Sequence, residues 1–187
     1  IYLLQASTMT IRGNNITSTG MGIYANQSPT IESDQNIIIT QGSQSTGIFY
    51  ESSNSGIITG NTITNTNIDK TDGYLVGIYL KLSDLTDVGS NVVGNTTINS
   101  YNEGIELENS DSSSVHNNSI SYNWNGLEYP SMTGHGIYVN TSSEGNNIYR
   151  NTLLENPIAD FTTSGNGGNN YYYNIIENAH VNGIDFR

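Results

Sequence analysis

The sequence contains no cysteine and only five basic residues, and these two scarcities exclude whole classes of protein. Without cysteine, the chain offers no disulfide framework, no cysteine-ligated zinc site and no thiol nucleophile. Seventeen acidic residues give a formal net charge of −12, which disfavours nucleic acid or an anionic membrane surface as a partner. No apolar run in this segment is long enough to span a membrane, and the first residues do not have the pattern of a signal peptide.

Two short motifs recur along the whole chain. A Gly-Ile pair begins at Gly22, Gly47, Gly77, Gly104, Gly136 and Gly183. An Asn-x-apolar motif begins at Asn14, Asn36, Asn61, Asn118, Asn151 and Asn174, with a looser copy at Asn95. The step from glycine to asparagine is 14 residues in three repeats (22 to 36, 47 to 61, 104 to 118), whereas the return step varies. A repeat that is constant in one half and elastic in the other predicts a stacked solenoid with loops inserted at one corner.

Apolar residues align in columns when the repeats are superimposed. The three expected columns are Ile11, Ser33, Ile58, Val92, Val115, Ile148 and Tyr171; Ile16, Ile38, Ile63, Ile120, Leu153 and Ile176; and Ile1, Ile23, Ile48, Ile78, Ile105, Ile137 and Ile184. Apolar and polar residues alternate within each short segment, which predicts strands, and three segments per repeat predict three faces. The sequence therefore predicts a parallel β-helix, with asparagine hydrogen bonds at one corner and a glycine bend at another.

The repeats leave no break in composition, so we expect one β-helix domain over residues 1–187. Because Ile1-Tyr2-Leu3 reads as a first motif without its glycine, and Gly183-Ile184 stands close to the last residue, we expect a segment of a longer chain. Two insertions, at 65–76 and 121–135, are expected to leave the same corner of the solenoid.

The Asn-x-Ile and Gly-Ile-x-Leu/Val spacing resembles the PbH1-type repeat of pectin-lyase-like proteins and of many bacterial and archaeal secreted or surface proteins. This resemblance covers essentially the whole chain. It implies an all-β fold, a right-handed single-stranded parallel β-helix of about seven rungs with three strands per rung. It does not select an activity, because this scaffold carries lyases, hydrolases, tailspikes, adhesins and surface-layer segments.

The residue after each Gly-Ile pair is expected to point outward and to form a row along one face. That row comprises Tyr2, Tyr24, Phe49, Tyr79, Glu106 and Tyr138, and the insertions add Trp124 and Tyr129. An exposed aromatic row can bind a glycan or a neighbouring protein. It can equally stabilise its own sheet through contacts between neighbouring strands.

Glu106 and Glu108 lie one alternation apart on the same predicted face. Their carboxylates would be roughly 6–7 Å apart, close to the separation used by inverting glycosidases. They are therefore the alternative catalytic pair, although two outward glutamates also occur by chance in so acidic a chain. Gly134-His135-Gly136 is similar to a polygalacturonase motif, but the paired aspartate of those enzymes is missing.

Two further kinds of polar site are candidates. Asp84 and Asp87 could supply oxygen ligands to calcium, although acidic turn residues are more often simply solvated, and no other cofactor is expected. Asn-x-Ser/Thr sequons, which could carry glycans in an exported protein, occur at Asn15, Asn26, Asn95, Asn117 and Asn140. Asn26 and Asn140 are the first choices because their phase is outward.

Two functions follow from these features. The first is a structural or adhesive segment of a cell-surface or extracellular protein, surface layer or filament, which contacts copies of itself or other surface proteins through the aromatic row. The alternative is a carbohydrate-active enzyme or a tailspike-like protein that binds a polysaccharide with the same face. Many copies packed through one face would favour the first, and an oligosaccharide held between the insertions would favour the second.

Overall fold

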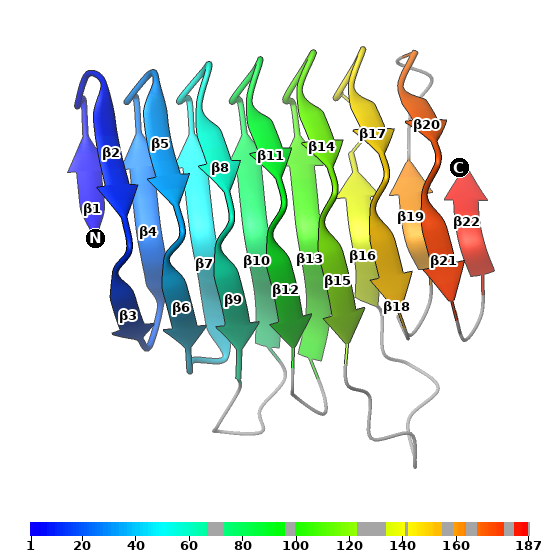
Figure 1. The fold of residues 1–187 in the computed structure, drawn as a ribbon, viewed down its shortest axis with the longest axis horizontal. Coiled ribbons are helices and arrows are strands. Elements are labelled where there is room, and N and C mark those ends of the chain that lie inside the picture. The colour runs from blue at the N-terminus through cyan, green and yellow to red at the C-terminus, as the bar shows by residue number, and fades with distance from the viewer. Residues whose placement is uncertain are drawn as a thin grey trace.

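The computed structural model describes residues 1–66, 73–95, 100–122, 134–140, 142–154, 159–163, 168–177 and 182–186, all as strands and the turns that join them. The strands form three parallel sheets, and the chain visits each sheet once per turn of a rod (Figure 1). This arrangement is the predicted right-handed parallel β-helix. Seven rungs contribute one strand to each of the three sheets, and one sheet has an additional eighth strand.

Each sheet takes every third strand of the chain. Sheet A contains β1 (Tyr2–Leu4), β4 (Met21–Asn26), β7 (Gln44–Glu51), β10 (Gly73–Lys81), β13 (Ser100–Glu108), β16 (Gly134–Val139), β19 (Ala159–Thr163) and β22 (Asn182–Phe186). Sheet B contains β2 (Met9–Arg12), β5 (Ile31–Asp34), β8 (Ile57–Thr59), β11 (Asp87–Gly89), β14 (Ser114–His116), β17 (Asn147–Tyr149) and β20 (Asn170–Tyr172). Sheet C contains β3 (Asn15–Ser18), β6 (Ile37–Thr40), β9 (Thr62–Asn65), β12 (Val92–Asn95), β15 (Ser119–Tyr122), β18 (Thr152–Leu154) and β21 (Ile175–Glu177).

The predicted isoleucine column after the glycines lies inside the rod. Ile23, Ile48, Ile78, Ile105 and Ile137 are aligned in neighbouring strands of sheet A and have no exposed surface. Each such side chain contributes roughly 1.5–3 kcal/mol by leaving water. Among the column members whose burial is described, Ile1, which directly precedes β1, is the exception, since it is exposed.

A glycine precedes each of these isoleucines because the chain bends there against the next rung. A β-carbon on Gly47 would lie 2.4 Å from Ile63 Cγ2 and 2.6 Å from the carbonyl oxygen of Gly77, and Gly22 and Gly77 are equally confined. Neither contact is possible without a shift of the backbone or of the buried isoleucine. The predicted role of the glycine column is confirmed.

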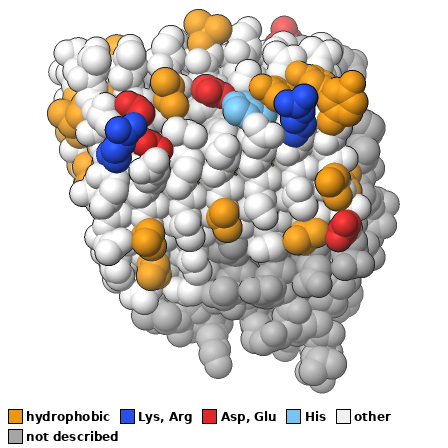
Figure 2. Space-filling model, in the orientation of Figure 1, with side chains coloured by type: hydrophobic (Ala, Val, Ile, Leu, Met, Phe, Trp, Pro, Cys, Tyr) orange, Lys and Arg blue, Asp and Glu red, His pale blue; other side chains and the backbone are white. Residues whose placement is uncertain are grey.

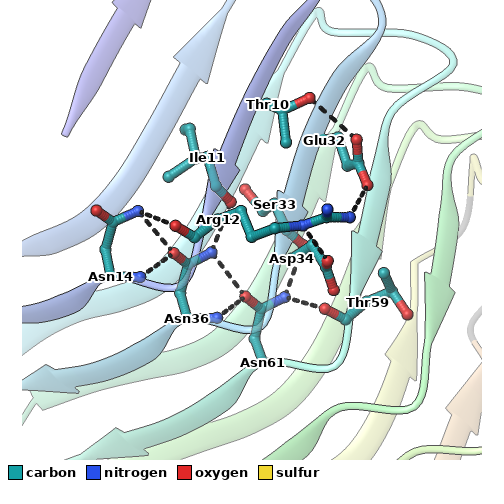
Figure 3. A network of polar contacts seen from close by, with 10 residues as sticks. All are labelled: Thr10, Ile11, Arg12, Asn14, Glu32, Ser33, Asp34, Asn36, Thr59 and Asn61. Atoms are coloured by element: carbon teal, nitrogen blue, oxygen red, sulfur yellow. Dashed lines mark hydrogen bonds and ion pairs between the residues drawn. The ribbon is translucent and has the colours of Figure 1, made fainter.

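The asparagine column forms a continuous ladder of hydrogen bonds (Figure 3). The Asn61 side-chain oxygen accepts the backbone N–H of Asn36 at 3.0 Å and its Nδ2 group at 2.9 Å. Asn36 Nδ2 also donates to the carbonyl of Ile11 at 2.9 Å. The full ladder is Asn14, Asn36, Asn61, Asn91, Asn118, Asn151 and Asn174.

Two expected members of the columns were wrong, both in the rung after Gly77. Asn91, and not Asn95, joins the asparagine ladder. Val88, and not Val92, joins the sheet B column between Ile58 and Val115. The step from Gly77 to Asn91 is again 14 residues, so the Asn-Thr-Thr-Ile sequence at Asn95 imitated the motif one strand too late.

A second ladder, of serines, was not expected from the sequence. Ser28, Ser53, Ser83 and Ser110 each donate a backbone N–H to the hydroxyl oxygen of the serine one rung on, all at 3.1 Å, and the last partner is Ser143. These serines are buried at the corner between sheets A and B. They satisfy turn amides that would otherwise be buried without partners.

The polar member of the first column, Ser33, has a specific partner. Its hydroxyl lies 3.0 Å from the hydroxyl of Tyr50, which is completely buried and also donates to the Ile31 carbonyl at 3.3 Å. Ala25 and Gly56 lie on neighbouring segments, and their small size leaves room for the Tyr50 ring. Burial raises the pKa of Tyr50, so the phenol stays neutral inside the rod.

The expected insertions differ in detail from the predictions, and the seventh strand of sheet A departs from the isoleucine column. Residues 73–76 and 134–135 belong to strands of sheet A, and residues 121–122 end β15, so both insertions are shorter than 65–76 and 121–135. Their central parts lie outside the described residues. In β19, Phe161 stands opposite Ile137 on one side and Ile184 on the other, so a phenylalanine takes the place of the isoleucine in that rung.

We expect Gly47→Ala to lower the free energy of unfolding by about 1–3 kcal/mol, because the new methyl group overpacks a site closed by backbone. Urea denaturation followed by circular dichroism measures this loss. Gly20→Ala is the matched control, since nothing lies within 4 Å of its β-carbon position. Equal stability of the two variants would contradict the proposed confinement.

We expect Asn91→Ala to lower the free energy of unfolding by roughly 2–5 kcal/mol, because it leaves the Asn61 amide and the Ile58 carbonyl buried without partners. Thermal and urea unfolding measure the effect. Asn15→Ala, at an exposed position of sheet C, should stay within about 0.5 kcal/mol of the wild type. A loss no larger than that of Asn15→Ala would show that the ladder is not needed.

Candidate functional site

The predicted aromatic row exists on the outer face of sheet A. Tyr2, Tyr24, Phe49 and Tyr79 occupy the same register position in successive strands, followed by Glu106 and Tyr138. Tyr2 is 66% exposed, whereas Tyr24, Phe49, Tyr79 and Tyr138 are half-buried. The row is therefore interrupted by a carboxylate between two tyrosines.

The rings of this row pack against one another. Phe49 and Tyr79 are stacked, with centroids 4.6 Å apart and planes at 10°. Tyr24 lies 5.2 Å from Phe49 and is tilted, and Tyr2 meets Tyr24 edge to face at 5.6 Å. Rings that stack along the rod give their faces to each other and present their edges outward, a geometry less suited to stacking on a sugar ring than to packing against a protein side chain.

The phenol groups of the row are held by carboxylates of the neighbouring outward row. Tyr24 donates to Glu51, and Asn26 Nδ2 donates to both, at 2.8 Å and 3.2 Å. Tyr79 donates to Glu108, whose other oxygen lies 3.2 Å from Lys81 Nζ. Burial and the adjacent carboxylates raise the pKa of Tyr24 and of Tyr79, so both phenols are neutral donors at neutral pH.

The alternative catalytic pair does not present two solvent-exposed carboxylates. Glu106 and Glu108 both point outward from β13, as predicted, but Glu106 is only 4% exposed. Glu108 is engaged by Lys81 and Tyr79. Both acids are outward as predicted, but Glu106 is covered by its surroundings and Glu108 is bound by its neighbours. Their catalytic role remains an untested prediction.

A glutamate–histidine pair lies on the same two strands as Glu106 and Tyr138, and the sequence alone did not single it out. Glu103 is 5% exposed, and its carboxylate oxygens lie 2.9 Å and 2.8 Å from His135 Nδ1 on the next strand. The His135 ring stacks on Tyr138 at 5.2 Å. Burial raises the pKa of the Glu103 carboxyl, and the bond with His135 opposes that shift. The available signal was that both residues directly precede the Gly-Ile glycine of adjacent repeats.

The calcium candidates have other partners. Asp84 accepts the backbone N–H of Asp111 at 2.8 Å, which is a turn-to-turn bond between rungs. Asp87 lies 2.8 Å from His116 Nε2 on the outer face of sheet B, and His116 stacks on Tyr149. Across the described residues, no group of three or more histidine, aspartate or glutamate side chains is arranged to hold a metal ion.

Solvent exposure ranks the predicted glycosylation sites differently from the sequence, which put Asn26 and Asn140 first. Asn15 and Asn117 are exposed, whereas Asn26 and Asn140 are half-buried. The side chain of Asn26 is also used in bonds to Tyr24 and Glu51. The side chain of Asn95 lies outside the described residues, as do Trp124 and Tyr129 of the second insertion.

The three-sheet rod and its buried asparagine ladder define the class of this protein as a right-handed parallel β-helix. Residues 1–183 match the NosD family, described as periplasmic copper-binding protein, and the chain belongs to that family. A comparison with curated proteins gives no match. The family description names the periplasm, which lies on the outer side of the cytoplasmic membrane. This agrees with the prediction only in placing the family outside the cytoplasm, and the cell-surface or extracellular location stays a prediction. Within the described part of the chain, no helix is long and apolar enough to cross a membrane.

The family description weighs against the expectation of no cofactor other than calcium, so we tested the copper ligands that the described residues offer. Copper prefers imidazole, thiolate and thioether ligands. The chain has no cysteine, three histidines and three methionines. Of these, His116 and Met9 lie on sheet B, and His135 and Met21 lie on sheet A. Within each sheet the histidine and the methionine are four strands, or about 19 Å, apart. The described residues therefore do not assemble a copper ligand set.

We expect the stability of Glu103→Gln, relative to the wild type, to increase as the pH rises from about 4, near the ordinary glutamate pKa, towards neutrality. The raised pKa of Glu103 means that its native form holds a proton more tightly than the unfolded chain does, so its contribution is full at low pH and is lost as the pH rises through the folded pKa. Glutamine does not titrate.

Urea unfolding of both proteins at matched pH values measures the difference. The same comparison in a His135→Gln background removes the contribution of the histidine. A stability difference that stays flat or falls as the pH rises would contradict the assignment.

Proposed function

We propose that the chain is a structural and adhesive β-helix segment of a cell-envelope protein, which binds another envelope protein through the outer face of sheet A. The observation that carries this proposal is the in-register row of Tyr24, Phe49 and Tyr79, bordered by Glu51 and Glu108. Such a mixed aromatic and polar surface is typical of protein interfaces, where tyrosine is enriched.

The charge of this face identifies the kind of partner that fits it. Glu51, Glu103, Glu106 and Glu108 belong to the outward rows of sheet A. Lys81 is the one lysine or arginine among the described positions of these rows. A second copy approaching this face would meet like charges, which oppose association. A partner with arginine or lysine side chains would complement the carboxylates. We therefore favour a different protein with a basic surface over a copy of this chain.

The ring geometry favours a protein over a polysaccharide as the ligand of this face. The stacked pair Phe49 and Tyr79 directs ring edges outward, whereas glycan platforms present ring faces. An anionic polysaccharide would in addition be repelled by the glutamates. The periplasmic description of the family supports a location on the outer side of the cytoplasmic membrane.

We expect a photo-crosslinking phenylalanine analogue at Phe49 to form a discrete adduct with one envelope protein when the chain is expressed in its native cells. The matched control carries the analogue at Tyr172, an exposed aromatic position on sheet B, and should not form that adduct. Because the interface is acidic, the yield at Phe49 should fall as the ionic strength rises. The same adduct from both positions, or binding to an uncharged oligosaccharide that competes with crosslinking, would contradict the proposal.

A further inference from the structure

The outer face of sheet C differs in chemistry from the other two faces. Its outward positions form two rows that follow the strand register. The first row is Asn15, Ile37, Thr62, Val92, Ser119, Thr152 and Ile175, and the second is Thr17, Ile39, Thr64, Gly94, Ser121, Leu154 and Glu177. We call these fourteen residues the sheet C face. None of them is aromatic, and only Glu177, at one end, is charged.

This lack of charge is unusual in a chain with a net charge of −12. Figure 2 shows charged side chains gathered over the upper strands of the view, which belong to sheet B, whereas the lower strands of sheet C carry scattered apolar side chains and a single acidic one. Arg12, Glu32 and Asp87 are among the charged groups of sheet B. Sheet C is thus the face on which another acidic molecule meets the least repulsion.

The sheet C face is also regular and partly apolar. Ile37, Val92 and Ile175 are about half exposed, and Ile39 is 37% exposed. β-branched side chains on parallel, in-register strands make a surface that a second sheet can approach at about 10 Å. No large side chain stands out from either row to prevent this approach.

We propose that the sheet C face is an interface at which two copies of this chain meet, with their rods antiparallel and Val92 at the centre. A copy is the occupant that the charge distribution favours, because each molecule is strongly acidic and repels its copy except where carboxylates are missing. This interface is separate from the sheet A face and does not rest on its proposed partner.

The position of Glu177 selects the antiparallel arrangement. A two-fold axis along the strand direction through β12 places Val92 against Val92, and Ile37 of one copy against Thr152 of the other. It also places Glu177 against Thr17. A two-fold axis along the rod would instead set Glu177 on the apolar Ile175 of the copy and bring the two glutamates together, which costs more.

The size of the face predicts a weak dimer. Seven strands spaced about 4.8 Å apart, with two outward rows, cover roughly 34 Å by 13 Å, or on the order of 900 Å² when both partners are counted. That area lies below the range of stable complexes and within that of transient ones. Salt should strengthen the dimer, because it screens the repulsion between two acidic molecules.

The lack of cysteine makes a direct test possible. We expect Val92→Cys to form a disulfide-linked dimer under mild oxidation, because the two-fold axis brings its two copies together. Ile37→Cys alone should crosslink at least tenfold more slowly, whereas a mixture of Ile37→Cys and Thr152→Cys should give the mixed dimer. Ile57→Cys is the matched control, since Ile57 is a 42% exposed, outward β-branched residue on sheet B.

A measurement without crosslinking keeps the result independent of oxidation. In sedimentation velocity up to millimolar concentration, the wild type should show a weak dimer that strengthens with salt. Val92→Lys should weaken it at least tenfold, while Ile57→Lys and the sheet A variant Phe49→Ser leave it unchanged. A monomer at every concentration, equal crosslinking by Val92→Cys and Ile57→Cys, or capture of another molecule at Val92 in place of a copy would overturn the proposal. Efficient self-crosslinking of Ile37→Cys would overturn the antiparallel arrangement.

Discussion

Hydrogen bonding between successive rungs at the asparagine corner is the constraint on which the rest of the structure depends. From Asn36 to Asn151, each ladder asparagine is buried and satisfies a backbone amide on one rung and a backbone carbonyl on another. A rung shifted by one residue would leave these groups buried without partners and turn its apolar side chains outward. This requirement explains why the step from glycine to asparagine stays nearly constant while the other connection varies.

Because the interior is determined by stacking, the three outer faces are free to differ. Sheet A carries aromatic rings, glutamates and the His135–Glu103 pair. Sheet B carries an ion pair of Arg12 with Glu32 and the stacked His116 and Tyr149. Sheet C carries uncharged outward side chains except for Glu177 at one end. A rod whose faces have different chemistry can contact different molecules at once, which suits a structural and adhesive role and is set by outward residues alone.

The scaffold and the outward chemistry carry different information about the family. Membership in the NosD family rests on nearly the whole length of the repeats, and the repeats encode the rod. Copper binding, as the family description has it, would need a ligand set, and each described histidine lies on a different sheet from the other and four strands from the methionine on its own sheet. Membership in the family therefore rests on the scaffold, and the described residues add no copper ligand set to it.

The sequence by itself determined the rod, since glycine, asparagine and isoleucine recur at nearly constant steps and each has a local physical reason to do so. It misplaced one rung, because Asn95 imitates the motif that Asn91 satisfies, and it did not reveal the serine ladder, whose members repeat without a distinctive neighbour. Only the tertiary structure brought Glu103 to His135, showed Glu106 to be buried, and separated the calcium candidates. These contacts join residues about thirty positions apart, so they depend on the register between rungs, which short-range patterns do not specify.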